Sequence, residues 1–229
     1  MTAHAFVSLR WRGISMVELL VALAVGLFIA AAGVTLMAGN LRENRALALE
    51  GRVMQELRTA ADIITRDLRR AGYWAGSLAA VQPAAATVVP ANPYLAVTLT
   101  TTPEHSVSFA FSRDTTENHH VDSNEQFGFR LRGGIVQMQL GSGNWQSLTD
   151  PNTVVVSEFN VAPTVEEIDL SAQCGVPCPA GDPTCPPRQQ VRSLAVSLTA
   201  RSAIDANVQR SLRSSVRLRN DFVVGACPG

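Results

Sequence analysis

The chain has 229 residues with 19 basic and 19 acidic side chains, and its formal net charge is zero. This neutrality gives no support for nucleic-acid binding, which needs a basic face that displaces counterions from phosphates. The hydrophobic share is 46%, and most of the excess over an ordinary soluble domain lies in one N-terminal block. The remainder is long enough to bury one core, so we expect one globular domain with an apolar appendage.

The first predicted element is a membrane-spanning helix over residues 14–39, which read ISMVELLVALAVGLFIAAAGVTLMAG. Apart from Ser15, Glu18 and Thr35, every residue is apolar or glycine, and about 20 apolar residues suffice to cross a bilayer as a helix. The apolar run is longer than that of a cleaved secretory signal, and nothing after Gly39 resembles an A-x-A cleavage site. We therefore expect the helix to stay on the protein.

Glu18 is the unusual residue of this span, because a carboxylate deep in a bilayer costs about 2.5–3.5 kcal/mol on insertion scales. One interpretation places it near the membrane surface, where it snorkels or is protonated. The other gives it a dedicated cationic partner. Since ionisable residues within membrane spans mark functional sites, we favour the second interpretation.

The string Arg12 to Leu23, RGISMVELLVAL, resembles the prepilin-type N-terminal motif, in which a basic leader ends in glycine and glutamate is the fifth mature residue. The resemblance implies that residues 1–13 are a leader and that a prepilin peptidase cuts between Gly13 and Ile14. It also implies methylation of the new amine of Ile14, and pairing of Glu18 with the terminal amine of a neighbouring subunit. The first mature residue is most often phenylalanine in major pilins, so Ile14 fits minor pilins and pseudopilins just as well.

Residues 40–72 are predicted to continue the helix with one apolar face and arginines and glutamates elsewhere. Apolar residues recur there at intervals of three and four: Val53, Leu57, Ala60, Ile64 and Leu68. No proline interrupts residues 14–70, which allows a single long helix, and Gly72 offers a C-terminal stop.

The helix end itself, residues 66–76 (RDLRRAGYWAG), resembles that of PilW-type minor pilins. In that family a cysteine often follows the Ala-Gly-Tyr turn, whereas Gly76 and Ser77 follow here. The usual local disulfide must then be absent or relocated to the late cysteines.

Strands are predicted beyond an irregular connection at residues 77–93, within a β-rich domain over residues 73–229. The predicted strands cover residues 95–101, 107–111, 127–131, 135–140, 154–161, 192–201 and 212–218. Gly133-Gly134 indicates a two-residue hairpin. The last two runs are expected to pair, with Leu194, Val196 and Leu198 facing the helix. An antiparallel sheet that covers a long helix is an α+β arrangement, in agreement with the type IV pilin-like fold that the N-terminus implies.

The four cysteines are all in the last quarter of the chain, three of them in a Cys/Pro-rich loop over residues 171–190: Cys174, Cys178, Cys185 and Cys227. An even number in a loop-like segment indicates disulfides, with three possible pairings. Zinc is the alternative, but C-x3-C-x6-C lacks paired C-x2-C knuckles and a nearby histidine. Arginines flank the apolar span on both sides, so the positive-inside rule is nearly balanced. Disulfides then place the N-terminus in the cytoplasm and the domain in the periplasm.

Residues 117–125, ENHHVDSNE, gather two histidines and three carboxylates. Their spacing matches no metal motif, and we interpret them as a solvated loop between strands, without a metal. The sequence contains no G-x-S-x-G elbow, glycine-rich phosphate loop or H-E-x-x-H motif, so we expect neither an enzyme nor a cofactor. The arginines at positions 210, 213, 217 and 219 fit the exposed side of an edge strand.

The resemblance implies a minor type IV pilin of the PilW type, anchored in the inner membrane and present in the pilus after assembly. The implied partners are other minor and major pilins through their N-terminal helices, the prepilin peptidase, the inner-membrane assembly platform and membrane lipid. A J-type minor pseudopilin of type II secretion is the alternative within the same machinery. A bitopic membrane sensor or enzyme is the alternative from another class, and it lacks a recognisable site.

Overall fold

A computed structural model describes residues 13–77 and 91–228. They form two compact units, the first ending at Ala48 and the second beginning at Leu49, and α1 (Met16–Leu68) runs through both. The expected leader lies almost wholly outside the described residues, as does most of the connection predicted at residues 77–93.

The single long helix is confirmed, with 53 residues and no proline. Glu18 lies in its first turn, where a carboxylate complements the positive end of the helix dipole. The helix ends two residues earlier than the uninterrupted pattern allowed, because Arg70 and Ala71 donate to carbonyls only three residues back. Gly72 then adopts a positive φ of 77°, and its N–H donates to the Ala110 carbonyl at 2.9 Å. The predicted glycine stop is therefore present just after the last turn.

The first sheet is an antiparallel meander in the order β1-β2-β3-β4-β5. Its strands are β1 (Val97–Thr100), β2 (Ser106–Ala110), β3 (Gln126–Arg132), β4 (Ile135–Leu140) and β5 (Trp145–Ser147). Gly133 and Gly134 connect β3 to β4 with φ of 59° and 78°, as a type I′ hairpin requires. The hairpin prediction is confirmed, and β5, only three residues long, was not predicted.

The second sheet has the order β6-β7-β8, with β9 paired to the other end of β7. Its strands are β6 (Val154–Asp169), β7 (Arg188–Ser202), β8 (Gln209–Arg217) and β9 (Phe222–Val224). The domain thus contains two sheets where one was expected. Its strands β6, β7 and β8 are also longer than predicted, and β7 starts inside the range assigned to the Cys/Pro-rich loop. Pro163 is tolerated in β6 because that strand is an edge and pairs only with β7.

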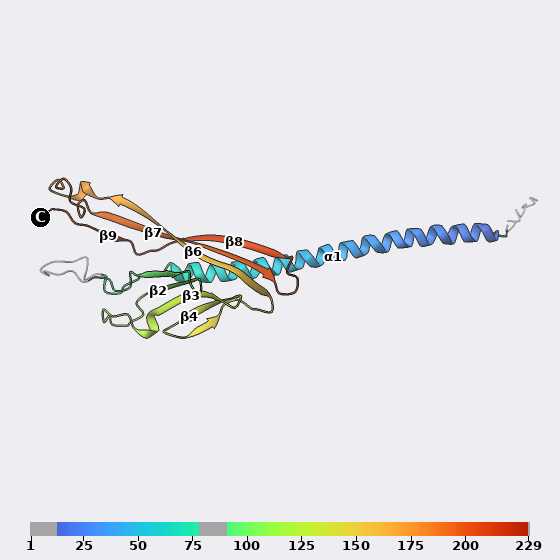
Figure 1. The fold of residues 1–229 in the computed structure, drawn as a ribbon, viewed down its shortest axis with the longest axis horizontal. Helices are drawn as coiled ribbons and strands as arrows, with labels where there is room; N and C mark the ends of the chain where they lie inside the picture. The colour runs from blue at the N-terminus through green and yellow to red at the C-terminus, as the bar shows by residue number, and fades with distance from the viewer. Residues whose placement is uncertain (1–12, 78–90, 229) are drawn as a thin grey trace, which may run out of the picture. The chain divides into compact units, whose positions relative to one another are not determined.

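One hydrophobic core joins the part of α1 beyond Ala48 to the inner faces of both sheets (Figure 1). The helix contributes its predicted apolar face, and β7 contributes Leu194, Val196 and Leu198, each at most 3% exposed, as predicted. Four phenylalanines, three in β2 and β3 and one directly after β2, stack beside them: Phe109, Phe127, Phe129 and Phe111. The α+β, pilin-like fold is thus confirmed. As predicted for the late arginines, β8 is an edge strand, and its Arg213 and Arg217 are exposed.

Candidate functional site

The predicted cleavage pair lies just before α1, where Gly13, Ile14 and Ser15 are outside the helix. The first intrahelical bond runs from the Leu19 N–H to the Ser15 carbonyl, at 3.1 Å. A Cβ added to Gly13 would meet no heavy atom within 4 Å, so packing within the described chain does not require glycine there.

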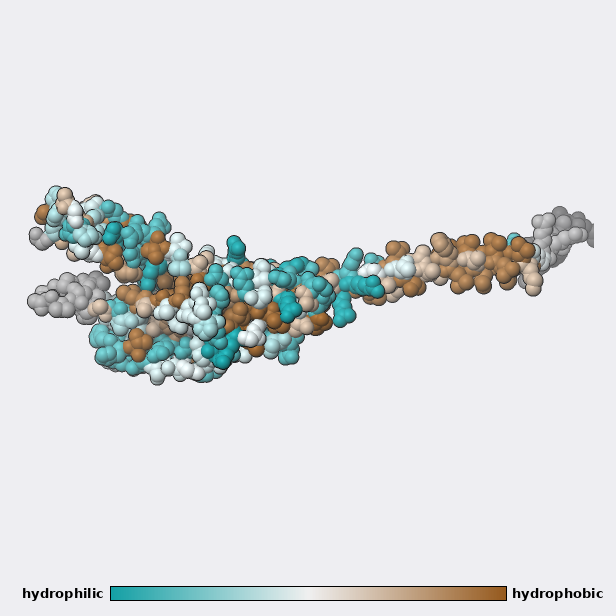
Figure 2. Space-filling view, in the orientation of Figure 1, coloured by the Kyte–Doolittle hydropathy of each residue, from teal (hydrophilic) through white to brown (hydrophobic). Residues whose placement is uncertain are grey.

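The first half of α1 is apolar over the face seen in Figure 2, and its large apolar residues are exposed at successive positions around the helix. An 18-residue window there has a mean hydropathy of 2.6 and no buried residue, and by length and composition the helix can cross a membrane. Leu20, Leu27 and Phe28 are 63%, 63% and 77% exposed. A helix that is hydrophobic on all sides needs lipid or other helices around it, because exposing so large an apolar surface to water is unfavourable.

Glu18 has no cationic partner within the described residues of the first unit. The first cationic side chain after Gly13 is that of Arg42, 24 residues beyond Glu18 and about 36 Å farther along the helix. A cation that pairs with Glu18 would have to come from the N-terminal region of the chain or from another molecule.

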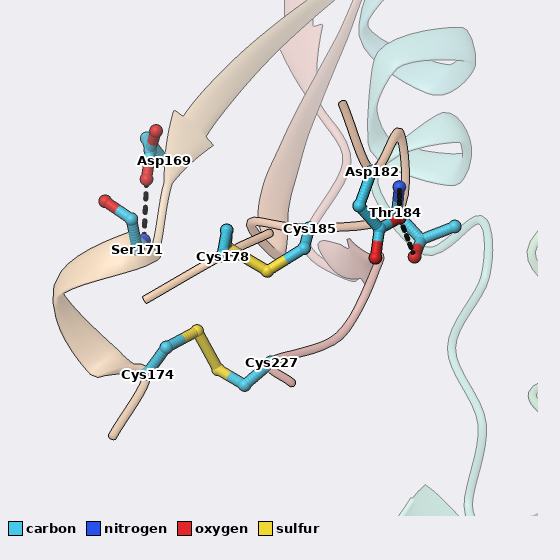
Figure 3. Close-up of a disulfide and its surroundings, with 8 residues drawn as sticks. All are labelled: Asp169, Ser171, Cys174, Cys178, Asp182, Thr184, Cys185 and Cys227. Atoms are coloured by element: carbon cyan, nitrogen blue, oxygen red, sulfur yellow. Dashed lines mark hydrogen bonds between the residues drawn. A yellow bond between two sulfur atoms is a disulfide. The ribbon is translucent and has the colours of Figure 1, made fainter. Parts of the chain in front are cut away.

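The four cysteines form two disulfides, Cys174–Cys227 and Cys178–Cys185 (Figure 3). The geometry selects one of the three pairings that the sequence left open. Hydrogen bonds from neighbouring residues stabilise the turns around these disulfides: Ser171 N–H donates to Asp169, and the Thr184 N–H and hydroxyl donate to Asp182 (Figure 3). These bonds hold the pKa of both carboxyls below the usual value.

The expectation of a solvated loop at residues 117–125 is wrong for Glu125, which is fully buried. Its carboxylate accepts hydrogen bonds from the Tyr94 hydroxyl at 3.0 Å, the Arg113 N–H at 2.6 Å and the Asp122 N–H at 3.0 Å. Burial, followed by the hydrogen bond and charge of Glu125, raises the pKa of Tyr94 above its usual range. Carboxylates of Asp114, Asp122 and Glu125 come within 4.8 Å of one another and are the residues that could hold a cation.

Tyr94 is fully buried, and sequence reasoning missed its role because it lies between the connection predicted at residues 77–93 and the strand predicted from residue 95. Its hydroxyl contacts the carboxylates of Glu117 and Glu125 and the carbonyl of His120. Since it connects this loop to the core, we assign the cluster a structural role. Its only signal in the sequence was an aromatic residue directly before the first strand-like run.

The model of the family described as prepilin peptidase-dependent protein B matches residues 46–218, about three quarters of the chain. No curated protein and no solved structure matches. The matched range begins after the apolar half of α1 and does not include the Gly13–Glu18 stretch.

Proposed function

We propose that this chain, which belongs to the family of prepilin peptidase-dependent protein B, is a minor type IV pilin of the PilW type. Such a subunit would help to initiate and assemble pili. The family suggests a structural protein rather than an enzyme, and it implies interaction with pilus components in general. The observation that carries the proposal is that two separate parts of the chain point to the same machinery. The motif at residues 12–18 and the matched residues 46–218 do not overlap.

The proposed site is the start of the mature chain. Cleavage after Gly13 would create an amine on Ile14, which the peptidase methylates, and would leave Glu18 as the fifth residue. Among the described residues, a Cβ at Gly13 would meet no heavy atom within 4 Å, which supports a role in recognition by the peptidase rather than in folding. The distance of Glu18 from the first following arginine supports pairing with the terminal amine of a neighbouring subunit.

We infer that α1 anchors the protein in the inner membrane with the C-terminal domain in the periplasm. Two disulfides support this orientation, because they persist in oxidising compartments. The partners that follow from the proposal are other minor and major pilins, the prepilin peptidase, the assembly platform and membrane lipid.

Mass spectrometry of the protein extracted from membranes tests the processing step. We expect the mature chain to begin at Ile14 with a methylated amine, and Gly13→Ala to leave an unprocessed precursor. Gly26→Ala is the matched control, since a Cβ at Gly26 also meets nothing within 4 Å, and it should be processed normally. An intact Met1 in the wild type, or cleavage beyond Glu18, would contradict the pilin assignment.

A J-type pseudopilin of type II secretion remains the second candidate, because the motif around Gly13 suits both machineries. A deletion strain separates them. We expect loss of surface pili with type II secretion intact, whereas the reverse result would assign the chain to secretion.

A further inference from the structure

A pocket of about 300 Å³ lies at the end of α1 and is rich in arginine. Arg69 and Arg70 directly follow the last helical residue, whereas Arg219 comes from the turn between β8 and β9. The lining residues are Arg69, Arg70, Tyr73, Ser112, Arg219 and Asn220. Three arginines, two adjacent at the end of α1 and one from the far end of the sequence, thus line one cavity.

The walls of this pocket are fixed by hydrogen bonds that do not involve the three guanidinium groups. The Asn220 side chain donates to the Ala71 carbonyl at 3.1 Å, and Arg192 donates to the Asn220 carbonyl at 3.1 Å. The Arg70 guanidinium lies over the Phe111 ring, 4.1 Å from its centroid. The chain segments that carry the arginines are therefore held in place before a ligand binds, which reduces the conformational entropy lost on binding.

No carboxylate neutralises these charges. Asp221, the acid nearest in sequence to Arg219, already accepts from Arg217 at 2.6 Å and from Gln189 at 3.0 Å. Every Asp and Glu of the chain lies within the described residues, and none forms an ion pair with Arg69, Arg70 or Arg219. Arginines just after a helix complement its dipole, but this does not account for Arg219, which joins them from another element.

We propose that this pocket binds an anion, and that the anion is a carboxylate on an acidic segment of a protein partner. The planar guanidinium fork matches a carboxylate bidentately, and Tyr73, half exposed, adds an aromatic and hydroxyl surface beside it. A nucleic acid would need a basic stripe, whereas the adjoining pocket adds only Arg217, whose charge Asp221 already pairs. If the chain is a pilin, as proposed above, the acidic segment belongs to a neighbouring subunit. Only this identification of the partner rests on the proposed function, and the binding of a carboxylate does not.

Binding of model anions to the full chain in a neutral detergent tests the proposal, and it does not depend on pilus assembly. The probe is a fluorescent capped peptide with two adjacent glutamates among glycines and serines, and its glutamine counterpart is the control. We expect the glutamate peptide to bind measurably by anisotropy and more weakly as salt increases, while the glutamine peptide does not bind.

Variants assign the binding to the pocket. Arg69→Gln and Arg219→Gln should each weaken the glutamate peptide about tenfold, because each removes a charge-assisted contact. Arg201→Gln, an exposed arginine on β7, removes the same charge elsewhere and should leave the affinity unchanged. Unchanged binding in both pocket variants would overturn the site. Tighter binding of a short single-stranded DNA than of the glutamate peptide would contradict the proposal that the ligand is an acidic protein segment. Competition by inorganic phosphate at the same concentration as the peptide would contradict it as well.

Discussion

The two disulfides close loops of very different length, which predicts unequal contributions to the free energy of unfolding. Cys174 and Cys227 are 53 residues apart, whereas Cys178 and Cys185 are only 7 apart. A cross-link removes from the unfolded chain a fixed amount of conformational entropy plus an amount that grows with the logarithm of the loop length. This gives about 4 kcal/mol for the longer loop and about 2.5 kcal/mol for the shorter one.

The native state modifies these values only slightly. Cys185 is 8% exposed, so removing its sulfur adds a small packing loss to the shorter loop, and alanine is the better replacement because serine would bury a hydroxyl. Without Cys174–Cys227, hydrogen bonds still attach the C-terminal segment to the domain, since β9 pairs with Arg188–Gln190 and the Ala226 N–H donates to the Thr184 carbonyl. At about 3 °C per kcal/mol for a domain of this size, the melting temperature should fall by about 12 °C without Cys174–Cys227 and about 7 °C without Cys178–Cys185.

Thermal unfolding of the full chain in detergent measures this difference. Fluorescence of Trp74, which is 4% exposed, reports on the domain rather than on the apolar half of the helix. The variants are Cys174→Ala with Cys227→Ala, and Cys178→Ala with Cys185→Ala, and peptide mapping first verifies that the remaining pair is intact. An equal loss in the two variants, or a larger loss for the shorter loop, would refute the argument from loop entropy.

Three further predictions follow from single carboxylates. The Glu18→Ala protein should be cleaved and inserted normally, yet it should enter pili at least about tenfold less often. The reason is that the amine proposed to pair with Glu18 is left unpaired in low dielectric. Separate assays of cleavage and of incorporation into pili check this. Glu125→Ala should lower the free energy of unfolding by about 2–4 kcal/mol, since the Arg113 and Asp122 N–H groups lose their acceptor, whereas the exposed Glu166→Ala should be neutral in the same urea titration. Asp150→Asn should destabilise the domain at pH 7 but not in acid. A hydrogen bond from the Asn152 N–H holds the pKa of Asp150 below its usual value, so its stabilisation is lost as the pH falls through that lower folded value. Melting temperatures of both proteins measured from pH 7 into the acid range check this.

The features that sequence predicted well are those set by local pattern. The apolar face of α1, the alternation in β3 and the Gly133-Gly134 turn each depend on residues a few positions apart. The N-terminal motif, whose processing stays a prediction, is also local, because Gly13, Ile14 and Glu18 lie within six residues. Such signals survive without any knowledge of tertiary contacts.

The features that sequence missed depend on contacts between distant segments. Residues 162–169 of β6 are exposed on both faces, so they carry no apolar alternation to mark a strand. Cys227 lies close to Cys174 because β9 pairs with β7, and the spacing of residues in the sequence does not predict such a long-range pairing. Burial of Glu125 likewise depends on Tyr94, 31 residues away. The arginine pocket has the same origin, since Arg219 reaches it from the far end of the domain sequence.

The change of character along α1 constrains how the proposed pilin could leave the membrane. From Leu49 onward the helix buries one apolar stripe in its own domain, whereas before Ala48 its large apolar side chains are exposed on every side. That first surface matches lipid, and leaving lipid for a fibre costs little only if other apolar helices cover it again. Apolar contact of this kind is non-directional and cannot by itself set the axial position of one helix against another. Glu18 is the single charged residue of the span, so a partner amine at a fixed height would supply the missing register.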